Sequence, residues 1–154
     1  MNSTVETILL YTIAAGFLSI VYGYFTGKNI LNSSAGNSKM QDIASAIQIG
    51  AKAYLARQYK TISIVGVVVL IIVSVAFSPL VGLGYLIGAA LSGIAGYVGM
   101  LVSVQANVRT AEASRKGLAS GLSVAFKSGA VTGMLVAGLA LLAIAVYYYL
   151  LLKF

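Results

Sequence analysis

The chain has 154 residues, of which 60% are hydrophobic and only 8% are charged. A soluble domain carries about 25% charged residues, so this chain lacks the polar surface of a water-soluble fold and its solvent is largely lipid. It contains no cysteine and no histidine, which excludes a disulfide framework, thiolate chemistry and the usual general base. The net charge of +7 does not indicate nucleic-acid binding, because the basic residues lie between long uncharged runs, as in membrane proteins.

The N-terminal apolar run is predicted to be a retained membrane span. It extends from Thr7 to Thr26, which is about long enough to cross a bilayer as a helix. A cleaved signal peptide opens with basic residues, whereas the first charge here is Glu6 and the next is Lys28. The following stretch, residues 29–38, is rich in Asn, Ser and Gly and is predicted to be a flexible loop.

An amphipathic helix is predicted over residues 40–60. Apolar side chains recur there near helical spacing, while Ser45, Gln48 and Lys52 lie on another face. The helix is expected to run directly into the second span, residues 61–77, which is rich in Val and Ile. The apolar positions that carry the pattern are Ile43, Ile47, Tyr54, Leu55 and Tyr59.

Two further uncharged runs complete a set of four spans. The third is predicted over residues 80–105, just after the only proline, and the fourth over residues 129–152. None of the four runs contains Asp, Glu, Lys or Arg, so each can lie in hydrocarbon with its backbone groups bonded inside a helix. The third helix is expected to continue past the membrane surface, where Glu112 and Lys116 form an i,i+4 pair, and to end near Gly117.

The basic residues predict the orientation of the spans. Nine of the ten Lys and Arg residues lie between spans one and two or between spans three and four. The positive-inside rule makes that side cytoplasmic, so both termini are expected outside and both basic segments are expected to be cytoplasmic and helical. The nine residues are Lys28, Lys39, Lys52, Arg57, Lys60, Arg109, Arg115, Lys116 and Lys127.

Small residues repeat every four positions along three of the spans. Such stripes let another helix backbone approach closely, so they predict a tightly packed helical assembly. Two interpretations stay open: the stripes hold these four helices together, or some of them face helices that this chain does not contain. The stripes are Ala15, Ser19, Gly23 and Gly27 in span one, Gly84, Gly88, Ser92 and Gly96 in span three, and Gly129, Gly133 and Ala137 in span four.

The sequence offers little for catalysis or ion conduction. Ion pathways usually need ionisable groups inside the membrane, and the four spans contain none apart from tyrosines. A magnesium site needs carboxylates, and the only acidic residues are Glu6, Asp42 and Glu112, with Glu6 on the opposite side from the other two. No Walker-type glycine-rich loop is present, so we predict no catalytic residue and no metal ligand. The basic residues either attract an anionic substrate or lipid headgroup, or simply fix the topology.

Three stretches of the chain form a recognisable set. The first is residues 49–62 (IGAKAYLARQYKTI), the second joins residues 96–100 (GYVGM) to residues 106–111 (ANVRTA), and the third is residues 121–131 (GLSVAFKSGAV). In sequence and in order they resemble the segments around helices two, three and four of the membrane-bound, ion-translocating pyrophosphatases. Together they tie nearly the whole chain to the N-terminal part of that family.

The chain departs from the family pattern at a few positions and in length. Gln105 and Lys127 stand where arginine is common, and Ser128 stands where glycine is common. Family members are much longer single chains, in which an inner ring of helices carries the active site and pore and the first four helices lie in an outer ring. The acidic segments with which they bind magnesium pyrophosphate have no counterpart here.

The resemblance implies that this chain is the N-terminal portion of a larger helical bundle in the cell membrane. The intact protein is expected to hydrolyse pyrophosphate at its cytoplasmic face, to export protons or sodium ions, to require Mg2+ and to act as a homodimer. No residue here matches a catalytic or metal position of the family, so the fragment alone is predicted to be inactive. Four basic residues are predicted to line the cytoplasmic mouth: Lys52, Arg57, Lys60 and Arg109.

Two other functions stay open. The chain is alternatively a stand-alone four-helix membrane module that keeps the outer-ring helices for assembly and has no catalysis. The other alternative is a small transporter formed by an oligomer of four-helix units. The transporter is the weaker alternative, because small transporters usually keep a membrane-embedded carboxylate and these spans have none.

Overall fold

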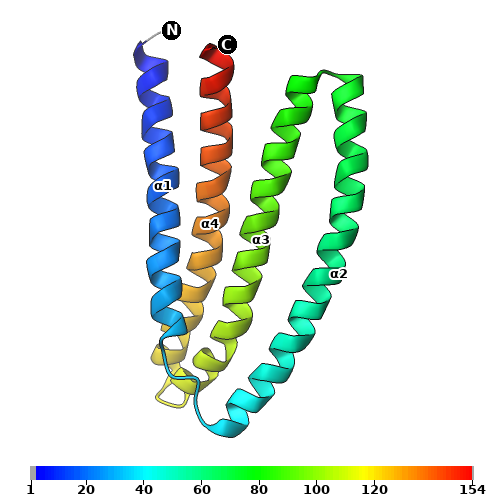
Figure 1. Ribbon diagram of the computed structural model, residues 1–154. Helices are drawn as coiled ribbons and strands as arrows, with labels where there is room; N and C mark the ends of the chain where they lie inside the picture. Colours follow the sequence, from blue (N-terminus) through cyan, green and yellow to red (C-terminus); the bar gives the residue numbers. More distant parts are fainter. Residues whose placement is uncertain (1–2, 154) are drawn as a thin grey trace.

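The computed structural model describes residues 3–153 as four long helices joined by short connections. In chain order they are α1 (Ser3–Leu31), α2 (Ser38–Ala76), α3 (Pro79–Ser114) and α4 (Leu118–Lys153) (Figure 1). Each is long and apolar enough to cross a membrane, which confirms the all-α prediction. With 29 to 39 residues they measure about 44 to 58 Å and exceed the roughly 30 Å hydrocarbon core of a bilayer.

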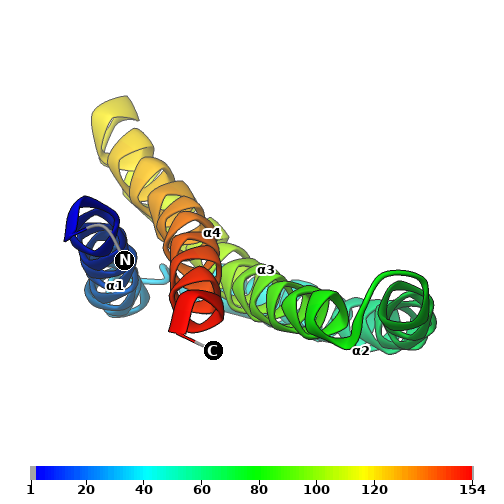
Figure 2. The same cartoon turned by 90° about the horizontal axis from the view of Figure 1, so that it is seen from above.

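The helices alternate in direction and form an open arrangement, not a closed bundle. The start of α1 and the end of α4 lie at the same end of the molecule as the α2–α3 turn (Figure 1). The opposite end, called here the basic end, holds the α1–α2 loop (residues 32–37) and the α3–α4 turn (residues 115–117). Seen from above, α4 lies between α1 and α3, and α2 stands on the far side of α3 (Figure 2). Within the described residues α2 packs against α3 alone.

Short polar residues and glycines set the helix ends. The side chain of Asn37 accepts a hydrogen bond from the Met40 amide at 3.0 Å and caps α2. The Ser78 hydroxyl accepts from the Val81 amide at 3.3 Å, and the following proline suits the first turn of α3. Gly117, with φ +131°, makes the turn into α4.

The predicted loop over residues 29–38 is shorter than expected. Helix α1 continues through Asn29 and Ile30 to Leu31, and α2 already begins at Ser38. The Asn32 amide still donates to the Lys28 carbonyl at 3.1 Å, so the last turn of α1 is completed by backbone hydrogen bonds. The polar composition that suggests a loop here belongs partly to a helix end.

Glycine brings α1 and α4 into backbone contact. A Cβ atom placed on Gly16 would lie 2.9 Å from the Gly138 carbonyl oxygen, and one placed on Gly138 would lie 2.8 Å from the Gly16 carbonyl oxygen. Ser19, Gly23 and Gly27 continue this contact, since they lie against Gly138, Leu135 and Val131 respectively. The stripe predicted in span one therefore faces α4, with the correction that Gly16 is buried in it and Ala15 is exposed.

The contacts of α3 differ along its length. A Cβ atom on Gly99 would lie 2.7 Å from the Thr132 side chain of α4, as expected for a glycine used in packing. Near the other end the Tyr147 hydroxyl of α4 donates to the Leu80 carbonyl. On its other side α3 meets α2, where the Tyr59 hydroxyl donates to the Gly93 carbonyl at 2.7 Å. The two neighbours α4 and α2 thus occupy different faces of α3.

The stripe predicted in span four does not pack within this chain. Gly129, Gly133 and Ala137 are exposed, and a Cβ atom on either glycine would have no neighbour within 4 Å. Gly88 of α3 is open in the same way. Helix α4 instead turns Gly138 towards α1. These open small residues leave room for a further helix backbone, whereas the span-one stripe is already filled.

Arg109 ties the basic end together. Its guanidinium donates to the Leu31 carbonyl from Nε at 3.1 Å and from Nη2 at 2.6 Å, and to the Gln105 carbonyl from Nη1 at 2.7 Å. One side chain of α3 therefore satisfies a carbonyl that the end of α1 leaves without a helical partner. Ile30, Ala106 and Val131 form the most deeply buried apolar cluster beside it.

The predicted Glu112–Lys116 pair is wrong. Among the described residues Glu112 forms its ion pair with Arg115, at 3.1 Å between Oε2 and Nη1. Helix α3 ends at Ser114, so Lys116 has left the helix and no longer lies one turn along the same face from Glu112.

Replacing Gly138 with alanine should separate α1 from α4. The added methyl meets the Gly16 backbone, which cannot rotate away, so we expect a loss of about 1–3 kcal/mol in stability. Thermal unfolding in mild detergent, followed by circular dichroism, measures the loss. Gly50→Ala is the matched control, since nothing lies within 4 Å of a Cβ atom there. Equal stability of the two variants would contradict the glycine contact.

Replacing Arg109 with glutamine should loosen the basic end. The shorter neutral side chain cannot hold the Leu31 carbonyl, and loss of charged hydrogen bonds costs about 1.5–3 kcal/mol. Hydrogen exchange of the last turn of α1 should rise, and the unfolding temperature should fall. Arg57→Gln removes the same charge from an exposed position and should leave both measurements unchanged. An equal effect of the two variants would mean that charge alone matters.

Candidate functional site

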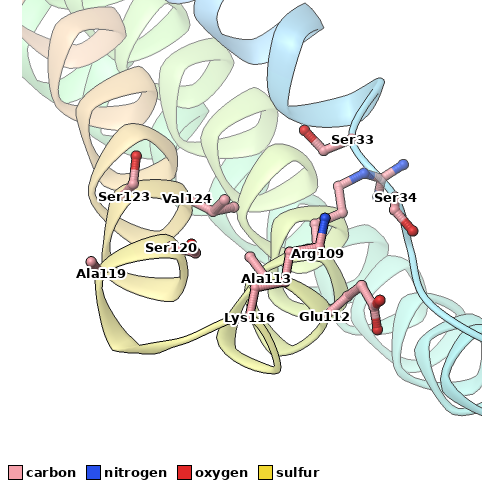
Figure 3. A pocket seen from close by; sticks show the side chains of 10 residues that line it. All are labelled: Ser33, Ser34, Arg109, Glu112, Ala113, Lys116, Ala119, Ser120, Ser123 and Val124. Carbon is pink, nitrogen blue, oxygen red and sulfur yellow. The ribbon is translucent and has the colours of Figure 1, made fainter.

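A cavity of about 500 Å³ with a largely polar and charged lining opens at the basic end. Three segments surround it: the loop after α1, the last turns of α3 and the first turns of α4 (Figure 3). Its lining combines two cations, one carboxylate, four serines and a small apolar wall. The residues are Ser33, Ser34, Arg109, Glu112, Ala113, Lys116, Ala119, Ser120, Ser123 and Val124.

Part of this lining is already engaged in holding the fold. Arg109 bonds the Leu31 and Gln105 carbonyls, as described above. The Ser33 hydroxyl donates to the Asn29 carbonyl at 3.1 Å, and the Ser34 hydroxyl accepts from the Gly36 amide at 3.2 Å. Glu112 is paired with Arg115. These groups build the walls of the cavity.

Three side chains of the lining remain free to bind something else. Within residues 3–153 the structure gives no hydrogen bond or ion pair to the side chains of Lys116, Ser120 or Ser123. All three are exposed. Because the charge of Glu112 is offset by Arg115, Lys116 and Arg109 leave the cavity net positive. The arrangement can attract an anion.

The four predicted substrate residues do not come together. Lys52, Arg57 and Lys60 are exposed on α2, and none of them lines the cavity that Arg109 lines. Arg109 itself is partly buried and committed to backbone carbonyls. Their role at a cytoplasmic mouth stays a prediction. Sequence reasoning included Lys116 among the basic residues able to attract an anion, but it missed Ser120 and Ser123. The signal available for these two was their spacing of three residues just after Gly117.

The three acidic residues are dispersed over the described residues. No group of three or more His, Cys, Asp or Glu side chains in this part of the chain could hold a metal ion. Glu6 lies in the first turn of α1, at the end of the molecule opposite Glu112. Asp42 is exposed on α2.

A larger cleft, of about 720 Å³, lies between α2 and α3 and is mainly apolar. Tyr59, Tyr85 and Tyr97 contribute its aromatic lining. Tyr59 and Tyr97 meet edge to face with ring centroids 5.4 Å apart. In the most apolar stretch of α2 no residue is buried. Within the described residues this side of the molecule is open.

Comparison with known proteins identifies the family. The family model for inorganic H+ pyrophosphatase matches residues 17–153. The chain is 42% identical over 147 residues to the K(+)-insensitive pyrophosphate-energized proton pump of Methanosarcina mazei, covering 94% of this chain and 22% of that protein. It is 39% identical over 153 residues to the putative K(+)-stimulated pyrophosphate-energized sodium pump of Bacteroides thetaiotaomicron, covering 95% and 21%.

A third relative, the putative K(+)-stimulated pyrophosphate-energized sodium pump of Clostridium tetani, is 38% identical over 129 residues, covering 84% of this chain and 19% of that protein. The chain thus spans about a fifth of the length of these curated relatives. Its four apolar helices agree with their description as pumps. This multi-pass integral membrane chain therefore belongs to the family of inorganic H+ pyrophosphatases, the membrane pumps energised by pyrophosphate.

Proposed function

We propose that this chain is the N-terminal portion of a pump that couples pyrophosphate hydrolysis at the cytoplasmic face to export of protons or sodium ions. The observation that carries the proposal is the 42% identity to a pyrophosphate-energized proton pump along 94% of this chain. Because that match covers 22% of the relative, most of the pump lies outside the sequence described here. Relatives with proton and with sodium pumping are both similar, so the ion stays open.

In this pump the four helices act as a scaffold. Their apolar runs carry no Asp, Glu, Lys or Arg, whereas ion pathways usually depend on such groups within the membrane. The pump is expected to use Mg2+, but the carboxylates present here do not fit that ion. Glu112 is paired with Arg115, and Asp42 and Glu6 lie on other helices. Hydrolysis and conduction are therefore assigned to the remaining helices.

The open surfaces support this scaffold role. Gly129, Gly133 and Gly88 have space above them, and the cleft between α2 and α3 is apolar and unfilled. Further helices of the pump, or the second subunit of a homodimer, would cover such surfaces. Lys52, Arg57 and Lys60, exposed on α2, remain the basic residues available to a substrate entrance.

A stand-alone, non-catalytic four-helix module is the second candidate. The observation that favours it is the tight internal contact of α1, α4 and α3, where Gly16, Gly138 and Gly99 bring helices together without any further chain. A complete module, however, leaves unexplained the exposed small residues of α4. We therefore rank it below the pump.

The basic end is proposed to face the cytoplasm, with both termini outside. The chain has no cysteine, so single cysteines can report this directly. A membrane-impermeant maleimide added to intact cells should label Ser78→Cys, in the α2–α3 turn, and should label Ser34→Cys only after permeabilisation. The two serines are matched in size and both lie outside the helices. The reverse labelling pattern would invert the orientation.

Activity of the whole protein tests the function. The gene should first be read in frame past the codon for Phe154, and the complete product expressed in a host without such a pump. Inside-out vesicles should release phosphate from magnesium pyrophosphate and accumulate protons or sodium ions. Vesicles with residues 1–154 alone should stay at background, because the chain lacks a metal centre. A stop codon directly after Phe154, with no partner gene supplying the other helices, would refute the proposal that the chain is part of a pump. Hydrolysis by residues 1–154 alone would refute the scaffold role.

A further inference from the structure

We propose that the cavity at the basic end binds a phosphate group, carried either by an anionic lipid headgroup or by a free anion. This site is separate from the hydrolysis assigned to the remaining helices, and it does not depend on that activity. Its three recognising groups are the ammonium of Lys116 and the hydroxyls of Ser120 and Ser123. The tetrahedral oxygens of a phosphate accept hydrogen bonds from such donors.

The turn between α3 and α4 places these three donors along the lining of one cavity. Ser120 and Ser123 are three residues apart near the start of α4, so they share one face of that helix. Lys116 approaches from the other side of the turn, where Gly117 reverses the chain. All three line the same cavity, and within residues 3–153 none has another side-chain partner. They are donors without an acceptor.

The surrounding walls favour a negative charge. Arg109 uses three of its five N–H donors on backbone carbonyls and keeps its positive charge at the cavity edge. The one carboxylate of the lining, Glu112, is neutralised by Arg115. The residue before α4 is Gly117, which has no side chain to cap the first turn, so the amides there remain available to an anion. These features add to the electrostatic attraction of Lys116 for an anion.

The position of the cavity relative to the bilayer surface allows two sources of phosphate. Arg109 lies four residues beyond Gln105, where the uncharged run of α3 ends, which is about 6 Å along the helix. The headgroup layer on each side of a bilayer is about 5–8 Å deep. A lipid phosphate and an anion from solution can therefore both reach the site. The apolar wall of Ala113, Ala119 and Val124 is compatible with either.

Chemical footprinting of lysines tests the site in the protein as the gene encodes it. The protein is placed in nanodiscs of phosphatidylcholine, with or without phosphatidylglycerol, and acylated with an amine-reactive reagent. Mass spectrometry then gives the acylation rate of each lysine. Lys116 should react about fivefold more slowly when phosphate is bound, since an ion pair worth about 1 kcal/mol must first break. Lys39, exposed near the start of α2 and outside the cavity, is the internal control.

The arms of this experiment separate the sources. Protection of Lys116 only in nanodiscs that contain phosphatidylglycerol identifies a lipid headgroup. Protection by added inorganic phosphate in nanodiscs of pure phosphatidylcholine identifies a free anion. The double variant Ser120→Ala/Ser123→Ala should abolish either protection while leaving the unprotected rate of Lys116 unchanged. Equal protection of Lys39 and Lys116, persistence of protection in the double variant, or no protection by either ligand would overturn the site.

Discussion

The backbone contact between Gly16 and Gly138 holds α4 against α1, and α4 lies between α1 and α3. Glycine on both sides lets α1 and α4 approach more closely than any side chain would permit. Helix α4 then offers a separate face to α3, through Thr132 against Gly99. Helix α2 contacts α3 alone among the described helices. The α1–α4 and α3–α4 interfaces are equally extensive and the α2–α3 interface is smaller, which leaves the apolar stretch of α2 the most exposed of the four.

Much of this fold could be predicted from the sequence, because lipid imposes simple rules. An uncharged run must form a helix to satisfy its backbone, and serine before proline or a glycine after a charged stretch marks its ends. The choice of contact face was harder. Stripes of small residues in three spans look alike in sequence, yet the one in α1 is filled and the one in α4 is open. Spacing alone does not distinguish Ala15 from its neighbour Gly16, and it is Gly16 that contacts Gly138 of α4.

The candidate site was less predictable than the fold. The charge of Arg109 suggests a substrate entrance, but its partner is a carbonyl 78 residues away, and no local sequence pattern indicates such a contact. Lys116 was expected to pair with Glu112 until the helix end at Ser114 removed it from that face. The cavity exists because a loop, a helix end and a helix start meet, so it depends on tertiary structure. The charge of this region can be predicted from the sequence, but its shape cannot.

The α2–α3 turn has a consequence for how the protein enters a membrane. From residue 61 to residue 105 the chain contains no charged side chain, and this stretch includes the turn at Ser78. During biogenesis the two helices can pass into the bilayer together as one hairpin, and no ionised group has to traverse the hydrocarbon. The Ser78 cap and the proline after it are local features of this hairpin and need no contact with α1 or α4. Insertion of this pair is thereby uncoupled from assembly of the rest.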